Sequence, residues 1–210
     1  MRVIAIDGPA GSGKSTVSRR LAERLGLAYL DTGAMYRAVA FAALRRDIDP
    51  EDDEKVAALV RDITIEVTLE AVTVDGIDAT VEIRGPEVTR AVSVVAANPA
   101  VREELRRRQR EWAVHRGGGV VEGRDIGTVV FPDAELKVYL TAAPEARAQR
   151  RADEVRELDY ETVAAELARR DALDQGRDHS PLTAADDALH VDTTDRTVEQ
   201  IVDALMERLA

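Results

Sequence analysis

The glycine-rich stretch near the amino terminus carries the clearest chemistry in this sequence. It reads Gly8-Pro9-Ala10-Gly11-Ser12-Gly13-Lys14-Ser15-Thr16. Spaced glycines followed by a lysine and a hydroxyl form the phosphate-binding loop pattern, because glycines let successive backbone N–H groups turn toward phosphate oxygens. We expect Lys14 to bridge the β- and γ-phosphates of ATP and Ser15 to place its hydroxyl on Mg²⁺. The residues expected to contact this nucleotide are Gly8, Ala10, Gly11, Ser12, Gly13, Lys14, Ser15 and Thr16.

The segments on either side of the loop have the patterns that such a loop requires. Residues 3–6 form a short apolar run, which predicts a strand buried on both faces. After the loop, Val17, Leu21 and Leu25 recur at helical spacing up to Gly26. The order is therefore strand, loop, helix, which is the setting in which the motif binds phosphate.

The rest of the chain alternates predicted strands with predicted helices. Further buried strands are expected at 28–30, 119–121, 136–140 and 188–191, and helices at 34–46, 54–61, 100–114, 144–155, 160–173 and 198–208. Alternation of this kind predicts an α/β fold with a parallel sheet. The length of 210 residues fits one folding unit.

One segment breaks this rhythm. Ile63, Ile65, Val67 and Leu69 alternate with polar residues, which is the period of a half-exposed strand. Asp75-Gly76 then stands between two short β-prone runs, a strong hairpin signal. We expect a small antiparallel sheet, from residue 63 to about 84, inserted into the α/β core.

Composition excludes several classes of protein. The net charge is -11, which argues against a protein that coats nucleic acid or an anionic membrane. The sequence contains no cysteine, and its three histidines lack the spacing of metal ligands. No run of 18 apolar residues occurs. We therefore expect a cytoplasmic protein without a nucleic-acid or membrane partner.

Two segments at predicted strand ends could hold a phosphorylated acceptor. In residues 30–37, Leu-Asp-Thr-Gly-Ala-Met-Tyr-Arg, Arg37 falls one helical turn after Gly33. In residues 122–128, Glu-Gly-Arg-Asp-Ile-Gly-Thr, Arg124 could bind a second phosphate and Asp125 could accept from an exocyclic amine. Glu122 could act on the Mg²⁺ shell through water. A structural ion pair is the alternative for this second segment.

Two arginine-rich segments are open to competing interpretations. Arg102, Arg106 and Arg110 recur every four residues, but glutamates are interleaved with them, which favours a solvated helix face with local ion pairs. Residues 170–177 contain Arg170, Asp171, Asp174 and Arg177, which we expect just past the end of a helix as either sugar and phosphate ligands or a salt-bridge cluster.

A predicted helix with Arg147, Arg150 and Arg151 runs toward the poorly patterned residues 153–159. This arrangement is typical of a mobile lid. Lid arginines can exclude water from the γ-phosphate and stabilise charge in the transition state.

Three of these segments together resemble the bacterial cytidylate kinases: residues 6–16, residues 30–37 and residues 122–134, which continue as Val-Val-Phe-Pro-Asp-Ala after Thr128. The resemblance implies a P-loop nucleoside-monophosphate-kinase-like domain, in which a parallel sheet has helices on both faces. The core would comprise 1–62, 95–147 and 174–210, the inserted antiparallel substrate-binding subdomain about 63–94, and the lid about 148–173. It implies an enzyme that transfers the γ-phosphoryl group of ATP to CMP or dCMP, with Mg²⁺. The sequence also shows no obvious exposed apolar helix, so we expect a monomer.

The same resemblance implies roles for individual residues. Ser93, Arg102 and Asp125 would contact the cytosine ring, Arg37, Arg124 and Arg177 would hold the acceptor phosphate, and Arg170 and Asp174 would contact the sugar, with Thr32 also at the acceptor site. Lys14, Arg124, Arg147 and Arg150 would act in catalysis. Gln175 stands where the family often has serine, which leaves the sugar contacts less certain than the phosphate contacts.

The chemistry of cytosine agrees with the roles implied for its ligands. Cytosine offers an amine donor that a carboxylate such as Asp125 can accept, whereas uracil presents an oxygen at the same place. The residues alone leave two other functions open: a P-loop kinase of another small molecule (another nucleoside monophosphate, shikimate or dephospho-coenzyme A), and a non-enzymatic nucleotide-dependent binding module.

Overall fold

The computed structural model describes residues 1–154, 159–176 and 182–209. Within them the chain forms two compact units, each described by itself. Unit 1 comprises Met1–Ala28 and Arg116–Ala210, and unit 2 comprises Tyr29–His115.

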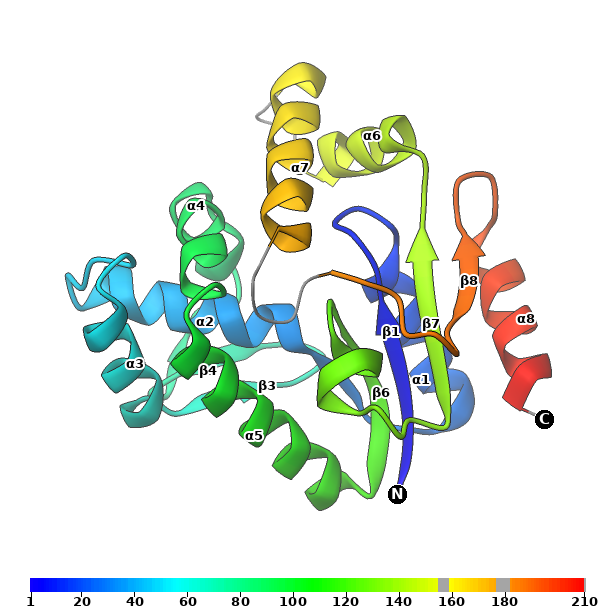
Figure 1. Cartoon of the computed structure of the whole chain (residues 1–210), viewed down its shortest axis with the longest axis horizontal. Coiled ribbons are helices and arrows are strands. Elements are labelled where there is room, and N and C mark those ends of the chain that lie inside the picture. Colours follow the sequence, from blue (N-terminus) through cyan, green and yellow to red (C-terminus); the bar gives the residue numbers. More distant parts are fainter. Residues whose placement is uncertain (155–158, 177–181, 210) are drawn as a thin grey trace. The chain divides into compact units, whose positions relative to one another are not determined.

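Four parallel strands form the centre of unit 1 (Figure 1). They are β1 (Arg2–Asp7), β6 (Gly118–Gly123), β7 (Leu136–Thr141) and β8 (Leu189–Asp192), which pair in the order β6-β1-β7-β8. Each lies within two residues of a strand expected from the sequence. The register places Asp7 beside Gly123 on one side and Tyr139 on the other, so these three residues reach the carboxyl edge of the sheet together.

Helices α1 (Lys14–Leu25) and α8 (Val198–Leu209) pack against each other, and α1 also packs on β1 and β6. The spacing of Val17 and Leu21 turns both side chains into the core, where they are buried. Gly26 ends α1 in a left-handed conformation, and its N–H donates to the carbonyls of Ala22 and Glu23. The prediction for this helix is confirmed at both ends.

Helices α6 (Pro144–Glu154) and α7 (Tyr160–Gln175) pack on each other beyond the carboxyl end of β7 (Figure 1). Position 155, where the predicted helix ended, lies outside the described residues. Because no helix-breaking residue precedes Gly176, α7 continues past 173. Arg170, Asp171 and Asp174 therefore all lie within the last turns of α7. This corrects the expectation for Asp174, which lay past the end of the predicted helix at 160–173.

Unit 2 is organised around α2 (Thr32–Arg45), which follows the short strand β2 (Tyr29–Asp31). Helix α2 packs against α3 (Asp53–Asp62), the 3₁₀ turn η1 (Glu82–Arg84) and α4 (Pro86–Val95). Its buried positions include five alanines, Ala34, Ala38, Ala40, Ala42 and Ala43, which allow close approach of these neighbours. Helix α5 (Pro99–Arg116) ends the unit, with Arg116 assigned to unit 1.

The small antiparallel sheet of unit 2 consists of β3 (Ile65–Val67), β4 (Val72–Val74) and β5 (Ile77–Asp78). Asp75 and Gly76 both have positive φ, 52° and 75°, and connect β4 to β5 as the two-residue turn that the sequence predicted.

The predicted extent of this sheet needs three corrections. The sheet begins at Ile65, because Ile63 closes helix α3 and its N–H donates to the carbonyl of Leu59. Strand β3 ends at Val67 and Leu69 is 55% exposed, because Thr68 begins a turn closed by its N–H and the carbonyl of Ala71. The sheet also stops at Asp78, and the chain then forms η1 and α4. Helix α4 was not predicted, because its β-branched valines and threonine favour a strand. Pro86 begins the helix instead.

Candidate nucleotide-binding site

The loop between β1 and α1 closely approaches the chain around it. At Gly8, with φ 150°, an added Cβ would lie 2.2 Å from the carbonyl oxygen of Leu140. At Gly11, with φ 74°, it would lie 3.0 Å from Cβ and the carbonyl oxygen of Arg147. Only glycine fits at these two positions. The spacing read from the sequence therefore corresponds to a real packing requirement.

Lys14 lies inside this loop at the start of α1. Its side chain is buried, and Nζ donates to the carbonyl of Pro9 over 2.7 Å. Burial lowers the pKa of Lys14 to about 7, and the positive charge of Arg124 adds to this effect, while the carboxylate of Glu122 opposes it. An anionic ligand in the loop would supply the missing counter-charge.

The first turn of α1 is suited to an anion. Gly13 precedes it in a left-handed conformation, and the turn contains no acidic residue to offset the positive end of the helix dipole. Ser15 and Thr16 are exposed there. The start of α1, with its dipole, and the side chain of Lys14 thus lie together in the loop.

The segment after β6 is the second part of the site in unit 1. Glu122 and Asp125 are buried, and a π-helical turn, η2 (Ile126–Val130), follows them. The carboxylate of Asp7 accepts from the backbone N–H of Ile126 and from that of Gly127, each over 2.8 Å. Burial raises the pKa of Asp7 to about 6, although the two hydrogen bonds lower it.

Asp7 was absent from the predicted site. The one signal for it in the sequence is a charged residue at the end of a buried strand, immediately before the loop.

Arg124 is fixed by a residue of α7. Its Nε donates to Oδ2 of Asp174 over 2.8 Å, and the carboxylate of Asp174 is almost completely buried. Arg170, from the same helix, contributes to lowering the pKa of Lys14. Four residues selected from separate parts of the sequence, Lys14, Arg124, Arg170 and Asp174, are therefore brought together in unit 1.

Two of the three arginines of α6, Arg147 and Arg150, contact the phosphate-binding loop and its surroundings. Arg147 forms an ion pair with Asp171 and donates to the carbonyl of Ala10 over 3.2 Å. Arg150 donates to the hydroxyl of Thr193 over 2.9 Å, and that hydroxyl donates to the carbonyl of Ser12 over 3.1 Å. Arg147 thus contacts the loop backbone directly, and Arg150 contacts it through the hydroxyl of Thr193.

The remaining candidates lie in unit 2. Nη1 of Arg37 donates to the carbonyl of Ile83 and to the hydroxyl of Thr89, each over 3.0 Å, which ties α2 to η1 and α4. Arg102 is buried, donates to the carbonyl of Ala96 over 3.1 Å and stacks over the ring of Tyr36. Thr32 and Ser93 are buried as well. Arg177 lies outside the described residues.

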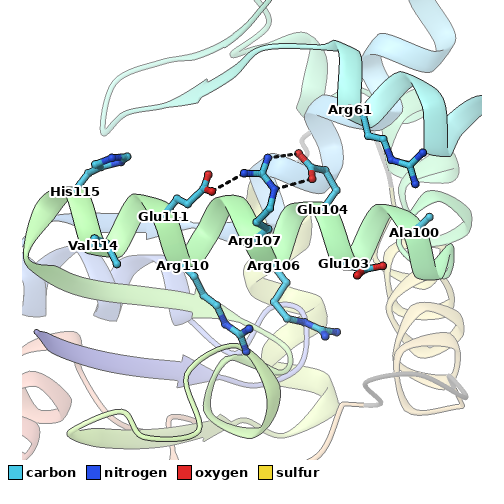
Figure 2. A pocket seen from close by; sticks show the side chains of 10 residues that line it. All are labelled: Arg61, Ala100, Glu103, Glu104, Arg106, Arg107, Arg110, Glu111, Val114 and His115. Atoms are coloured by element: carbon cyan, nitrogen blue, oxygen red, sulfur yellow. Dashed lines mark hydrogen bonds and ion pairs between the residues drawn. The ribbon is translucent and has the colours of Figure 1, made fainter.

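A pocket of about 670 Å³ along α5 contains none of the predicted site residues (Figure 2). Figure 2 shows Arg107 between Glu104 and Glu111, at 2.7 Å and 2.5 Å. Arg106 and Arg110 also line the pocket, while Arg102 lies buried one turn earlier. The interpretation of this helix as largely a face with local ion pairs is consistent with these contacts.

The fold and the loop geometry together define a P-loop nucleotide-binding protein. Solved structures share this fold at low sequence identity. A protein of Eubacterium ventriosum has a TM-score of 0.55 at 14% identity, with 100% of this chain and 98% of that chain covered. The shikimate kinase of Bacteroides thetaiotaomicron has a TM-score of 0.50 at 12% identity, with 99% and 98% covered.

Sequence comparison narrows the class to one family. The model of the cytidylate kinase family matches residues 4–210. The cytidylate kinase of Mycobacterium avium is 51% identical over 213 residues, covering 98% of this chain and 93% of the relative. The cytidylate kinase of Caldanaerobacter subterraneus subsp. tengcongensis is 48% identical, covering 98% of this chain and 93% of the relative. That of Bacillus subtilis is 46% identical, covering 97% of this chain and 94% of the relative. The chain belongs to the cytidylate kinase family.

Proposed function

We propose that this protein is an ATP-dependent phosphotransferase that converts CMP to CDP, and dCMP to dCDP. The observation that carries the proposal is the family match over residues 4–210, supported by relatives at 46–51% identity that cover nearly the whole chain. The phosphate-binding loop supplies the chemistry that the reaction needs. An oxygen of the CMP phosphate forms a bond to the γ-phosphorus, the bond from the β–γ bridging oxygen to that phosphorus breaks, and ADP leaves.

The loop and Lys14 would hold the donor. Successive N–H groups and the start of α1 would bind the β- and γ-phosphate oxygens. Because Lys14 is buried and its pKa is lowered to about 7, the negative charge of ATP would restore its protonated form. The ammonium would then neutralise charge on the leaving ADP.

Arginines would stabilise the transferring group. Arg124 is held by Asp174, so its guanidinium would meet the acceptor phosphate without reorganising. Arg147 and Arg150 would act from α6, where their hydrogen bonds to Ala10 and Thr193 keep them near the loop. These catalytic roles are inferred from the family resemblance and from the chemistry of phosphoryl transfer.

The donor set fits Mg²⁺. Among the described residues, no group of three or more histidines, cysteines or acidic side chains could form a metal cage. Mg²⁺ in kinases is held instead by one or two protein oxygens, the phosphates and water. The exposed hydroxyl of Ser15 would be the protein ligand, and Glu122 would act through water. The ion would neutralise charge on the phosphates.

The acceptor ligands are proposed from the family resemblance. Cytosine would be read by Ser93, Arg102 and Asp125, and its phosphate would be held by Arg37, Arg124 and Arg177. Arg170 and Asp174 would contact the sugar, and Thr32 would complete the site. The fixed hydrogen bonds of Arg37 and the burial of Arg102 support preorganised roles for both residues.

Two further properties remain predictions. We expect a monomer, and we expect the protein to act in the cytoplasm. In the part of the chain that the structure describes, no helix is both long enough and apolar enough to span a membrane.

A panel of acceptors tests the proposed activity. ADP release from ATP and Mg²⁺ is measured with CMP, dCMP, UMP, AMP, shikimate and dephospho-coenzyme A. CMP and dCMP are expected to give the highest kcat/KM, and UMP a much lower one. Turnover with shikimate or dephospho-coenzyme A instead, or nucleotide binding without acceptor-dependent turnover, would contradict the proposal.

A further inference from the structure

Asp7 is a buried carboxylate to which the family resemblance assigned no role. It is the last residue of β1, it is 5% exposed, and it lies immediately before Gly8 of the phosphate-binding loop. Both of its carboxylate oxygens accept backbone hydrogen bonds from η2, Oδ1 from Ile126 and Oδ2 from Gly127. The carboxylate of Asp7 thus binds two backbone N–H groups that lie 119 and 120 residues further along the chain.

The start of η2 explains why these N–H groups are available. The first N–H groups of a helical turn have no partner within the turn and need an acceptor from elsewhere. Asp125 stands at the cap position, yet its side chain makes no capping hydrogen bond in the described part of the chain. Asp7 supplies the cap in its place, through one carboxylate oxygen for each of the two N–H groups.

This capping fixes the segment between β6 and η2 at both ends. On one side, Gly123 is paired in register with Asp7 through the β6–β1 ladder. On the other side, Ile126 and Gly127 are bonded to the carboxylate of the same residue. Only Arg124 and Asp125 lie between these two anchors. Both anchors are on Asp7, and Asp7 is joined directly to the loop that holds the donor phosphates.

We propose that Asp7 is a positioning residue for the acceptor, whose carboxylate sets Arg124 and Asp125 relative to the phosphate-binding loop. The inference rests on the proposed function, because it assigns Arg124 to the CMP phosphate and Asp125 to cytosine. A neutral side chain with one acceptor oxygen could not accept both N–H groups, one on each oxygen, as this carboxylate does. Burial opposes the ionised form of Asp7, as the raised pKa of about 6 records, and the two N–H donors offset only part of that cost.

The variant Asp7→Asn tests the proposal. Asparagine has the same size, but its amide nitrogen cannot accept, so one backbone N–H would face another donor. We expect the KM for CMP to rise at least about tenfold, the preference for CMP over UMP to fall, and the KM for ATP to change less than about threefold. A residue with only a structural role would not shift acceptor binding and base preference selectively.

Glu135→Gln is the matched control. Glu135 pairs with Arg2 at the other end of β1 and is partly exposed, so the change removes a carboxylate contact from the same strand without touching η2. Its KM values for both substrates and its base preference are expected to match the wild type.

If Asp7→Asn is too unstable to assay, Asp7→Ser tests the same contact with a smaller side chain. Serine keeps one acceptor oxygen, so one of the two backbone N–H groups of η2 loses its partner. The same selective rise in the KM for CMP is expected. An unchanged KM and base preference, or an equal rise in the KM for ATP, would overturn the proposal. A wild-type protein inactive with CMP would instead overturn the proposed function.

Discussion

At the scale of single residues, the site depends on charged groups held where water is scarce. Lys14 is buried with a lowered pKa, Asp7 is buried with a raised one, and Arg124 is held by the carboxylate of Asp174. Groups perturbed in this way cluster where ligands of opposite charge bind. Each of them gives an effect that can be measured separately.

The lowered pKa of Lys14 predicts that ATP binding takes up a proton. Without ligand, most Lys14 side chains are neutral at pH 8, because the pKa is about 7. The triphosphate raises the pKa, so the bound form is protonated. Calorimetry at pH 8 in buffers of different ionisation enthalpy should show uptake approaching one proton, and affinity should fall as the pH rises above 7.

The same titrations with Lys14→Met should show no uptake. Because the phosphates of ATP are already ionised at pH 8, they contribute little. A binding enthalpy for the wild type that does not depend on the buffer would show that Lys14 is charged before ATP arrives.

Arg37→Ala should weaken acceptor binding selectively. A hydrogen bond to a charged group contributes about 1.5–3 kcal/mol, so the KM for CMP should rise roughly tenfold to hundredfold while ATP binding stays nearly intact. Arg45→Ala on the same helix is the control, because Arg45 is exposed and lies over the ring of Phe41. Steady-state kinetics with each substrate varied measure both. Unchanged CMP kinetics would remove Arg37 from the acceptor site.

Asp125→Asn should weaken discrimination against UMP. The carboxylate accepts from the amine of cytosine and repels the oxygen of uracil, whereas an amide can donate to that oxygen. The ratio of kcat/KM values for CMP and UMP should fall by a factor equivalent to at most about 3 kcal/mol. Rejection of UMP as strict as in the wild type would contradict this role.

At the scale of elements, α6 and α7 both pack on the phosphate-binding loop. Ala10 of the loop is buried in a small apolar cluster with Ala148 of α6 and with Val163 and Leu167 of α7. The cluster is small enough to open at modest cost, and the Arg147–Asp171 ion pair links the same two helices. Among the described residues, the proposed lid would thus be held near the loop by this cluster and by the hydrogen bonds of Arg147 and Arg150.

Leu167→Ala should loosen that packing. Truncating a buried leucine costs about 2–5 kcal/mol, here within the α6–α7 pair. We expect a raised KM for ATP and severalfold faster ATP hydrolysis without acceptor, because water reaches the γ-phosphate more easily. Leu173→Ala in the same helix is the control, since Leu173 is 45% exposed and Leu167 only 8%. Equal rates of ATP hydrolysis by the two variants would show that the apolar cluster does not contribute to lid closure.

The elements that local patterns encode could be predicted, and those set by distant contacts could not. The loop with its strand and helix, and the Asp75-Gly76 turn, follow from short-range spacing and backbone conformation. Helix α4 was missed because its valines favour strands, and the end of α7 was misjudged because only Gly176 marks it. The capping of η2 by Asp7 joins residues 119 apart, so no local pattern could reveal it.

At the scale of the whole molecule, a chain with a net charge of -11 needs local means of holding anions. Unit 1 provides them through backbone N–H groups, one buried lysine and paired arginines, rather than through a basic surface. Unit 2 adds Arg37 and Arg102, each fixed by its own hydrogen bonds. Selectivity for phosphorylated ligands would therefore come from positioned donors, which act only at short range.

Transfer of label from ATP tests the central claim most directly. The protein is incubated with ATP labelled at the γ-phosphate, Mg²⁺ and CMP, and the products are separated. The proposed chemistry predicts that the label appears in CDP, with ADP formed in equal amount and little label in inorganic phosphate. Label released only as inorganic phosphate, or the absence of labelled CDP while ATP is bound, would contradict it.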